Sequence, residues 1–408
     1  MLGTAAALAA AAGPQKSAHA QPARNNTIRL GALTDISGPY RDVEGPTGTA
    51  CARQAIAEFT AANPDITVEL VVADHQNKPD VASAVVREWF DRAGVDAICQ
   101  VGNTSVALAA NTVAKEKDKV HLNSGALSSV LTGAQCSPNL VHGPLDTWAM
   151  SHATATAVVK DRGDTWFFIA ADYAYGHALR DDAAKFVRAA GGKVVGSVAH
   201  PFPGTTDFAS FLLQAQSSGA KVIALANSGA DLINCLKQAQ EFGVGRRGTR
   251  LVGLGAFTTD VAAVGLPVAQ GLLLTESFYW DLNDRTRAFY ARVKPRLDAG
   301  VIPNTLQAGA YALVKHYLAT AKAMGVAEAK QSGQKTVAAM KERSTDDDAF
   351  GEGVIRADGQ MIVPVYLFQV KTPEESRGPG DLFKRVATVP AAEAFRPLAE
   401  GGCPMIRS

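Results

Sequence analysis

From Thr27 onward, short apolar runs alternate with stretches of helical spacing, and the connections between them are short. The first part of this pattern fits strands at 28–33, 68–72, 97–99 and 120–122, with helices at 49–62, 79–93 and 106–114. Such an alternation predicts a parallel sheet with helices on both faces. In sheets of this kind, ligands bind at the carboxyl ends of the strands.

The alternation begins again after Asp146 and then changes character. Helices are expected at 147–160, 178–190, 207–217 and 230–242, and strands at 165–170, 194–199, 222–226 and 251–254. Beyond Glu276 come helical stretches at 285–297, 306–324 and 336–342, and two closing strands at 353–356 and 362–370. These late pieces can complete both units only if the chain crosses between them more than once.

The sequence therefore predicts an α/β protein with two doubly wound, Rossmann-like lobes joined by a multi-crossing hinge. We expect the ligand in the cleft between the lobes. The predicted N-terminal lobe contains residues 27–146 and 276–345, and the predicted C-terminal lobe contains residues 147–275 and 346–408.

Two predicted strands of the first lobe end in loops rich in glycine and hydroxyl residues. These loops are Gly102-Asn103-Thr104-Ser105 and the segment 123–129. A helix that starts at such a turn presents unpaired N–H groups and partial positive charge, which suits a small carboxylate. Ordinary helix capping and turn formation are the alternative interpretation.

The first twenty residues differ from the rest of the chain. Residues 4–13 are mostly alanine, and Ala18-His19-Ala20 has the small-x-small pattern of a signal-peptidase site, although no Lys or Arg precedes the alanine run. We expect residues 1–20 to be a signal peptide cleaved after Ala20, a low-complexity tail being the alternative.

Composition narrows the possible functions. The 408 residues are 47% hydrophobic and 19% charged with a net charge of +1, which is typical of a globular protein of two domains. This balance gives no indication of nucleic-acid binding, and no apolar run reaches the length of a membrane span. No nucleotide-binding fingerprint follows any predicted strand, so we expect no cofactor.

The five cysteines show no metal-binding spacing, and we expect no metal. Cys136 and Cys403 both lie in turn-rich segments and are the best candidates for a disulfide, which export would permit. Cys99 and Cys235 fit buried positions in a strand and a helix, and the pairing of Cys51 stays open. Asp346-Asp347-Asp348 lacks the glycine and the distal glutamate of an EF-hand calcium loop.

With these features in place, the chain from Thr27 to its end resembles the periplasmic solute-binding proteins of the leucine/isoleucine/valine type, which serve ABC importers. No single motif is specific, but their order and spacing together support the assignment. The motifs are the segments 33–39, 124–128, 172–176 and 237–243, together with Thr104-Ser105.

The resemblance implies a periplasmic, monomeric, non-enzymatic protein that delivers a small carboxylate to a membrane permease. It implies that the ligand carboxylate is held by Thr104, Ser105, the backbone of Ala126, and Ser128. It also implies that Tyr175 closes over the ligand and that Asn227 or Ser228 adds a contact from the second lobe.

One departure from the family concerns the ammonium group of an amino-acid ligand. Amino-acid binders of this family carry a glutamate after the strand that corresponds to 251–254, where this chain has Gly255-Ala256-Phe257. Burying an ammonium group without a counter-charge is costly. Asp172, Asp231 and Glu276 are acidic, but none stands at the matching position.

Aromatic residues gather near the expected cleft and offer stacking faces with polar groups. We therefore expect an aromatic or other non-amino organic acid, contacted also by Tyr40 and Phe257. The other rings of this group are Trp148, Tyr173 and Phe278-Tyr279-Trp280. Packing of these rings in the core or the hinge is the alternative.

Three other functions stay open at this point. The first is binding of a branched-chain or other amino acid within the same family. The second is a ligand-sensing domain, and the third is a hydrolase on a two-lobed α/β fold. A hydrolase would need a nucleophile with a base and an orienting acid, and the sequence has no G-x-S-x-G elbow and no H-E-x-x-H helix.

Overall fold

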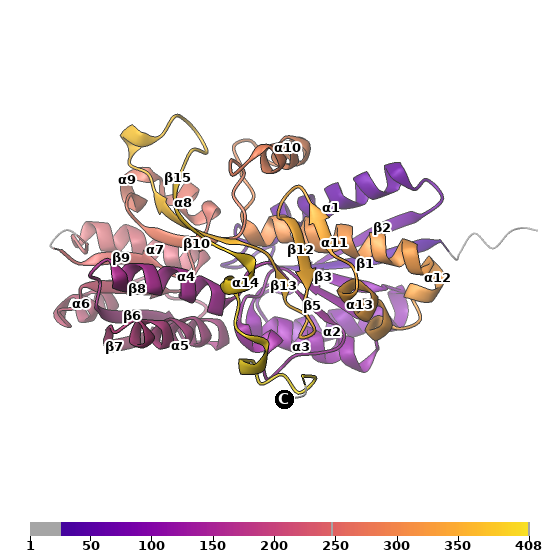
Figure 1. Cartoon of the computed structure of the whole chain (residues 1–408), viewed down its shortest axis with the longest axis horizontal. Helices are drawn as coiled ribbons and strands as arrows, with labels where there is room; N and C mark the ends of the chain where they lie inside the picture. The colour runs from indigo at the N-terminus through magenta and orange to yellow at the C-terminus, as the bar shows by residue number, and fades with distance from the viewer. Residues whose placement is uncertain (1–25, 246–247, 407–408) are drawn as a thin grey trace, which may run out of the picture.

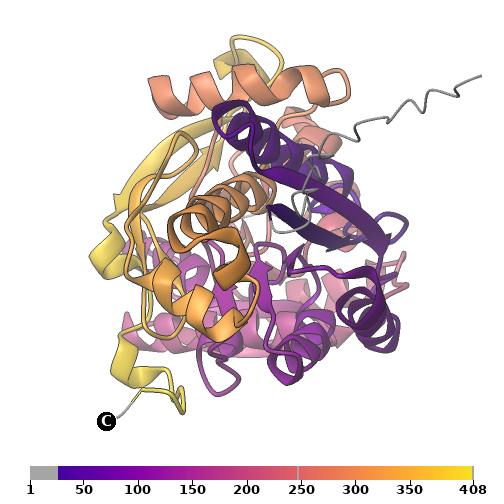
Figure 2. The ribbon, with the colours of Figure 1, turned by 90° about the vertical axis from the view of Figure 1, so that its right-hand side faces the viewer.

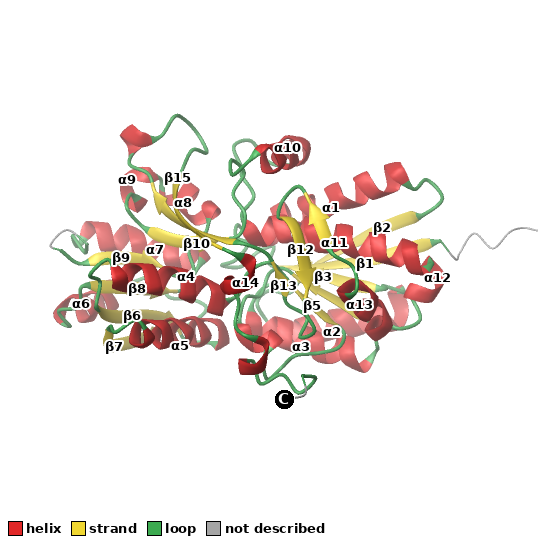
Figure 3. Ribbon diagram, in the orientation of Figure 1, coloured by secondary structure: helices red, strands yellow, loops and turns green. Residues whose placement is uncertain are grey.

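The computed structural model describes residues 26–245 and 248–406. Within them, the chain forms two α/β lobes that lie side by side, with the N-terminal lobe on the right in Figure 1 and the C-terminal lobe on the left. Each lobe consists of a β-sheet with helices on both faces (Figure 3). The predicted fold class is therefore confirmed.

The N-terminal lobe is built on a five-stranded parallel sheet with the order β2-β1-β3-β4-β5. Its strands are β1 (Thr27–Thr34), β2 (Thr67–Asp74), β3 (Ala97–Gln100), β4 (Val120–Asn123) and β5 (Leu140–His142). Its first helices are α1 (Gly45–Ala62), α2 (Pro79–Glu88) and α3 (Thr104–Glu116).

The C-terminal lobe is built on a seven-stranded sheet with the order β15-β14-β10-β9-β8-β6-β7. Its strands are β6 (Thr165–Ala171), β7 (Lys193–His200), β8 (Val222–Ala226), β9 (Arg250–Gly253), β10 (Leu273–Glu276), β14 (Val365–Val370) and β15 (Phe383–Val389). Strands β6 to β10 are parallel, and β14 and β15 add an antiparallel edge. Its helices are α4 (Thr147–Lys160), α5 (Ala174–Ala189), α6 (Ala209–Ser217), α7 (Gly229–Glu241), α8 (Thr258–Val264), α9 (Leu266–Ala269) and α14 (Ala391–Ala394).

Later segments of the chain return to the N-terminal lobe. They form α10 (Asp284–Val293), α11 (Thr305–Met324), α12 (Val326–Ala329) and α13 (Gly333–Lys341), and a small sheet of β11 (Thr345–Asp347), β12 (Gly351–Ile355) and β13 (Met361–Ile362). Seen from the side of this lobe, the helices coloured orange lie beside the indigo and purple sheet (Figure 2). The chain thus crosses between the lobes at 143–146, 277–283 and 363–364, as a multi-crossing hinge requires.

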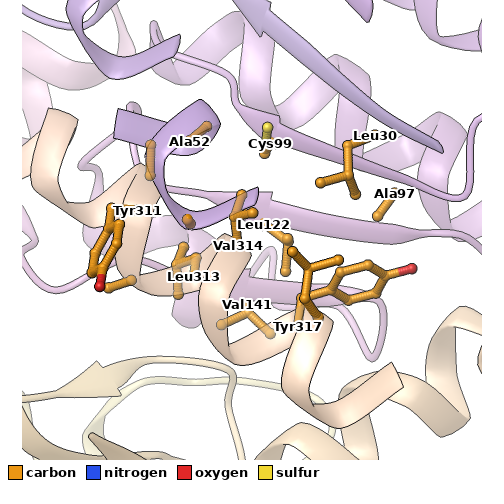
Figure 4. Close-up of a cluster of buried hydrophobic side chains, with 14 of the residues drawn as sticks. Leu30, Ala52, Ala97, Cys99, Leu122, Val141, Tyr311, Leu313, Val314 and Tyr317 are labelled. Carbon is orange, nitrogen blue, oxygen red and sulfur yellow. The ribbon is translucent and has the colours of Figure 1, made fainter. Parts of the chain in front are cut away.

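Helix α11 forms the centre of the N-terminal core. An Asn304–Gln307 capping box fixes its start, and most of its side chains are buried. Figure 4 shows Leu313, Val314 and Tyr317 of this helix beside Leu122 and other strand residues of the sheet. The helix is buried on nearly all sides because it packs against this sheet, α1 and α13.

The boundary at residue 345 differs from the expected one. Buried side chains of the segment 345–363, among them Phe350, Ile355 and Met361, share a hydrophobic cluster with Leu30 and Leu122 of the N-terminal sheet. The sequence had assigned this segment to the C-terminal lobe. The expected single strand 362–370 is also two strands, because Pro364 cannot donate a ladder hydrogen bond between β13 and β14.

Several short or edge elements were missed from the sequence: β5, β10, β11, β15, α8, α9, α12 and α14. Strand β5 has three residues, too few for a period to show. In β15 most side chains from Lys384 to Val389 are exposed, so it lacks the apolar run expected of a core strand. None of these elements changes the order of the strands that carry the cleft.

Cys136 and Cys403 form the predicted disulfide, which ties the C-terminal tail to the N-terminal lobe. Cys51, Cys99 and Cys235 are buried free thiols. No helix in the described part of the chain is long and apolar enough to cross a membrane. The predicted signal peptide at residues 1–20, with its cleavage after Ala20, lies outside the described residues.

The disulfide provides a test of the fold. It closes a loop of 267 residues, and cross-links of long loops stabilise mainly by restricting the unfolded chain. We expect the double variant Cys136→Ser/Cys403→Ser to lose about 2–4 kcal/mol of unfolding free energy in urea titrations. Dithiothreitol should lower the wild type to the level of the variant and leave the variant unchanged. Equal stability of the two proteins without reductant would contradict the prediction.

Candidate functional site

The same strand order recurs in both lobes and determines where a site can form. In β2-β1-β3-β4-β5 the direction of winding reverses between β1 and β3, and in the second lobe it reverses between β6 and β8. A crevice opens at the carboxyl ends of the strands at such a switch point. The loops after β1, β3 and β4 face the loops after β6, β8 and β9, and a cavity lies between them.

This cavity is lined from both lobes. The N-terminal lobe contributes Tyr40, Val43, Glu44, Gly102, Asn103, Thr104, Gly125, Ala126, Leu127 and Leu306, and the C-terminal lobe contributes Tyr173, Tyr175, Ser228 and Phe257. Six residues singled out from the sequence are among them: Tyr40, Thr104, Ala126, Tyr175, Ser228 and Phe257. The structure therefore brings the two predicted loops together.

Three other predicted site residues do not line the cavity. The hydroxyl of Ser128 is fully buried and accepts from the Val130 N–H, at the start of a short 3-10 turn. Asn227 is buried with its amide nitrogen 3.3 Å from Nε2 of His200. Ser105 is only half-buried on α3. A direct ligand contact by any of the three stays a prediction.

Most of the N–H groups expected to hold a carboxylate already have partners. The Ala126 N–H donates to Oδ1 of Asn123 at 2.9 Å, and the Ser105 N–H donates to Oδ1 of Asn103 at 3.0 Å. Asn103 is the N-cap of α3, with a positive φ of 61°. The side chains of the two loops therefore satisfy their own backbone donors, as in the capping alternative.

Glu44 occupies the space between the two loops. Its side chain is 3% exposed, and Oε1 accepts from the Asp35 N–H and from Nε2 of His75, both at 3.2 Å. A Cβ atom at Gly102 or Gly125 would overlap this carboxylate, so both loops need glycine there. Burial is the main cause that raises the pKa of Glu44 above its usual range.

An aromatic contact connects the lobes beside the cavity. The hydroxyl groups of Tyr40 and Tyr173 lie 2.6 Å apart. Phe202 stacks on both rings, with centroid distances of 5.4 Å to Tyr40 and 4.3 Å to Tyr173. Since Tyr40 belongs to one lobe and the other two rings to the opposite lobe, this contact holds the lobes together at the cavity.

Four buried polar atoms around the cavity have no hydrogen-bond partner among the described residues. They are Oε2 of Glu44 and the hydroxyl oxygens of Thr104, Tyr175 and Ser228. Buried polar groups in folded proteins are nearly always paired. Four such atoms at one cavity therefore indicate a site for a ligand with several polar groups.

The acidic residues considered as counter-charges from the sequence do not line the cavity. Asp172 is exposed and pairs with His177. Both oxygens of Glu276 are used, by Thr258 and Thr305. Asp231 lies 3.8 Å from Nδ1 of His200. Gly255, in the segment that replaces the family's glutamate, has no room for a side chain, because a Cβ atom there would meet the Tyr175 hydroxyl.

Glu44, Gly102, Gly125 and Leu127 were missed as site residues. From the sequence, Glu44 is an acid directly before the Gly45-Pro46 start of a helix, and no local pattern connects it to the later loops. The only available signal was the pair of glycines in those loops.

In the described residues, no group of three or more His, Cys, Asp and Glu side chains is placed to hold a metal ion.

Two lobes with the same strand order, which enclose a cavity lined by rings, aliphatic side chains and a few polar groups, define a protein that captures a solute between them. Comparison with known proteins agrees with this class. The family profile described as periplasmic binding protein matches residues 27–378. The chain therefore belongs to the periplasmic binding proteins of type I, which resemble the leucine/isoleucine/valine-binding proteins and serve ABC transporters.

Solved structures support this assignment. A periplasmic binding protein from Burkholderia mallei is 42% identical, with a TM-score of 0.88 and coverage of 94% of this chain and 100% of that one. A branched-chain amino acid ABC transporter periplasmic ligand-binding protein from Burkholderia xenovorans is 37% identical, with a TM-score of 0.81 and coverage of 93% and 99%.

More distant structures share the fold. A solute-binding protein of an ABC transporter from Rhodopseudomonas palustris, in complex with 3,4-dihydroxybenzoic acid, is 20% identical, with a TM-score of 0.77 and coverage of 90% and 98%. A comparison with curated protein sequences gives no match.

A buried acid next to the cleft gives a pH prediction. Asp260 caps α8 by accepting from the Phe257 N–H at 3.0 Å, and burial is the main cause that raises its pKa from 3.8 to about 8. Between these values the folded protein holds a proton that the unfolded chain releases, so the free energy of unfolding falls as the pH rises. We expect Asp260→Asn to flatten this decline in urea titrations at pH 5 and pH 8.

The exposed Asp161 provides the control, because Asp161→Asn removes an acid from a side chain that is 74% exposed. Its stability should keep the wild-type dependence on pH. A dependence in Asp260→Asn as steep as in the wild type would show that Asp260 does not hold the proton.

Proposed function

We propose that this protein captures a small solute in the cavity between its lobes and presents it to the membrane permease of an ABC importer. The observation that carries the proposal is the group of four unpartnered polar atoms at a cavity lined from both lobes. A solute that supplies the missing hydrogen bonds contacts both lobes at once. It therefore binds the closed form better than the open form and shifts the equilibrium toward closure.

We further propose that the solute has an apolar or aromatic body. Tyr40, Tyr173, Tyr175 and Phe257 provide buried rings, and Leu127 and Leu306 provide aliphatic contacts. Rings and aliphatic side chains around a few polar groups are typical of small-molecule sites. The aromatic acids preferred from the sequence fit this wall, although the occupied N–H groups of both loops leave few donors for a carboxylate.

An amino acid is the second candidate. The relative from Burkholderia xenovorans, 37% identical, is described as a branched-chain amino acid binding protein, and Glu44 supplies an acid at the cavity.

The periplasm is the proposed location of the mature protein, after removal of the signal peptide.

A thermal-shift screen tests the proposal with leucine, phenylalanine, benzoate and 3-phenylpropanoate. At about 100 times its dissociation constant, a bound solute stabilises the folded state by about 2.7 kcal/mol. We expect at least one of these compounds to raise the melting temperature of the wild type. No shift with any of the four would count against a small amino or aromatic acid as the solute.

Two variants test the site with the compound that binds. Tyr175→Ala removes a ring and a free hydroxyl from the cavity, and we expect the affinity measured by calorimetry to fall about tenfold or more. Ser128→Ala is the control, because its hydroxyl is buried away from the cavity, and the affinity should stay unchanged. The reverse result would show that the ligand lies against the Ser128 turn instead.

A further inference from the structure

We propose that Glu44 binds a positively charged ammonium group of the solute, held between its carboxylate and the rings of Tyr40, Tyr173, Tyr175 and Phe257. This inference rests on the proposed function and names the class of solute, an organic amine or an amino acid. The sequence assigned no binding role to Glu44, and the resemblance to the family expects an acid only in the opposite lobe.

The carboxylate of Glu44 is fixed with one oxygen free. The Asp35 N–H and Nε2 of His75 both bond to Oε1, whereas Oε2 has no partner among the described residues. Glycine at 102 and at 125 leaves the space that this carboxylate fills. The surrounding chain thus determines the position of the acid and leaves one oxygen for a donor from outside the protein.

The charges around the cavity favour a cation. None of the residues that line it within the described chain is Lys, Arg or His. Nδ1 of His75 accepts from the Asn77 N–H at 3.0 Å, so the proton on Nε2 is the one donated to Oε1 of Glu44, and Oε2 receives none from this ring. An anionic solute here would face a buried carboxylate, and no Lys or Arg side chain of the lining would compensate its charge.

The remaining wall suits an ammonium group as well. The faces of Tyr and Phe rings attract cations, and cages of such rings bind ammonium groups in proteins. Tyr40, Tyr173, Tyr175 and Phe257 are buried or half-buried around the cavity. The free hydroxyl oxygens of Thr104 and Ser228 add acceptors for further N–H groups.

Calorimetry with two ligands of matched shape tests the inference. The compounds 2-phenylethylamine and 3-phenylpropanoate carry the same ring on a two-carbon chain and differ in the sign of their charge, and L-phenylalanine carries both groups. We expect the amine and the amino acid to bind the wild type. Glu44→Gln, which keeps the shape and removes the charge, should weaken both about thirtyfold.

Two further variants separate the charge of Glu44 from general effects. Glu44→Asp retains the carboxylate and should bind the amine better than Glu44→Gln does. Asp42→Asn removes an exposed acid two residues away and should bind the amine like the wild type. Circular dichroism checks that each variant is folded.

The outcomes separate this inference from the proposed function. If 3-phenylpropanoate binds and the amine does not, or if Glu44→Gln binds the amine as tightly as the wild type, the ammonium role is overturned while solute capture stands. If none of the three compounds binds the wild type, the ammonium role is overturned, and leucine and benzoate from the thermal-shift screen then decide on solute capture.

Discussion

Four hydrogen bonds to one buried carboxylate hold the two lobes in their relative position. Oε1 of Glu276 accepts from the backbone and the hydroxyl of Thr258, at 2.6 and 2.7 Å, and Oε2 accepts from the same two groups of Thr305, at 2.8 and 2.9 Å. Thr258 begins α8 in the C-terminal lobe, and Thr305 begins α11 in the N-terminal lobe. Glu276 is therefore a fixed point at a crossing of the chain, which explains why it is not available to a ligand.

The cavity depends on this junction. Asn304, the N-cap of α11, donates through its side chain to the carbonyl oxygen of Val43, directly before Glu44, at 2.8 Å. The same amide also donates to Oγ1 of Thr259 in the opposite lobe at 3.1 Å. The start of α11 thus positions the segment that carries Glu44 relative to the C-terminal lobe. Asn304 thus connects the hinge to the segment that carries Glu44, so a movement of the hinge changes the position of Glu44 in the cavity.

The sequence was sufficient for features that follow from local periodicity and chain order. Thr104 and Ala126 come after consecutive parallel strands, so their meeting at one edge of the sheet followed from topology. For Ser128 the sequence leaves two roles open, because a hydroxyl that caps its own 3-10 turn has the same local sequence as one that faces a ligand. Glu44 was missed for a different reason: its contact with Gly102 and Gly125 depends on the entry angle of α1, which no local pattern encodes.

The chain has no acid at 255–257, directly after β9, but Glu44 supplies an acid to the cavity. In the C-terminal lobe the Tyr175 hydroxyl lies against Gly255, and the acid that faces the solute comes from the N-terminal lobe. Because Glu44 belongs to one lobe and most of the rings to the other, an ammonium group gains its ion pair and its ring contacts together only when the lobes are closed. Such a group has a higher affinity for the closed form, and this difference is the only means by which a solute can drive closure. A solute without the positive charge makes no ion pair with Glu44, so its affinity for the closed form exceeds its affinity for the open form by less.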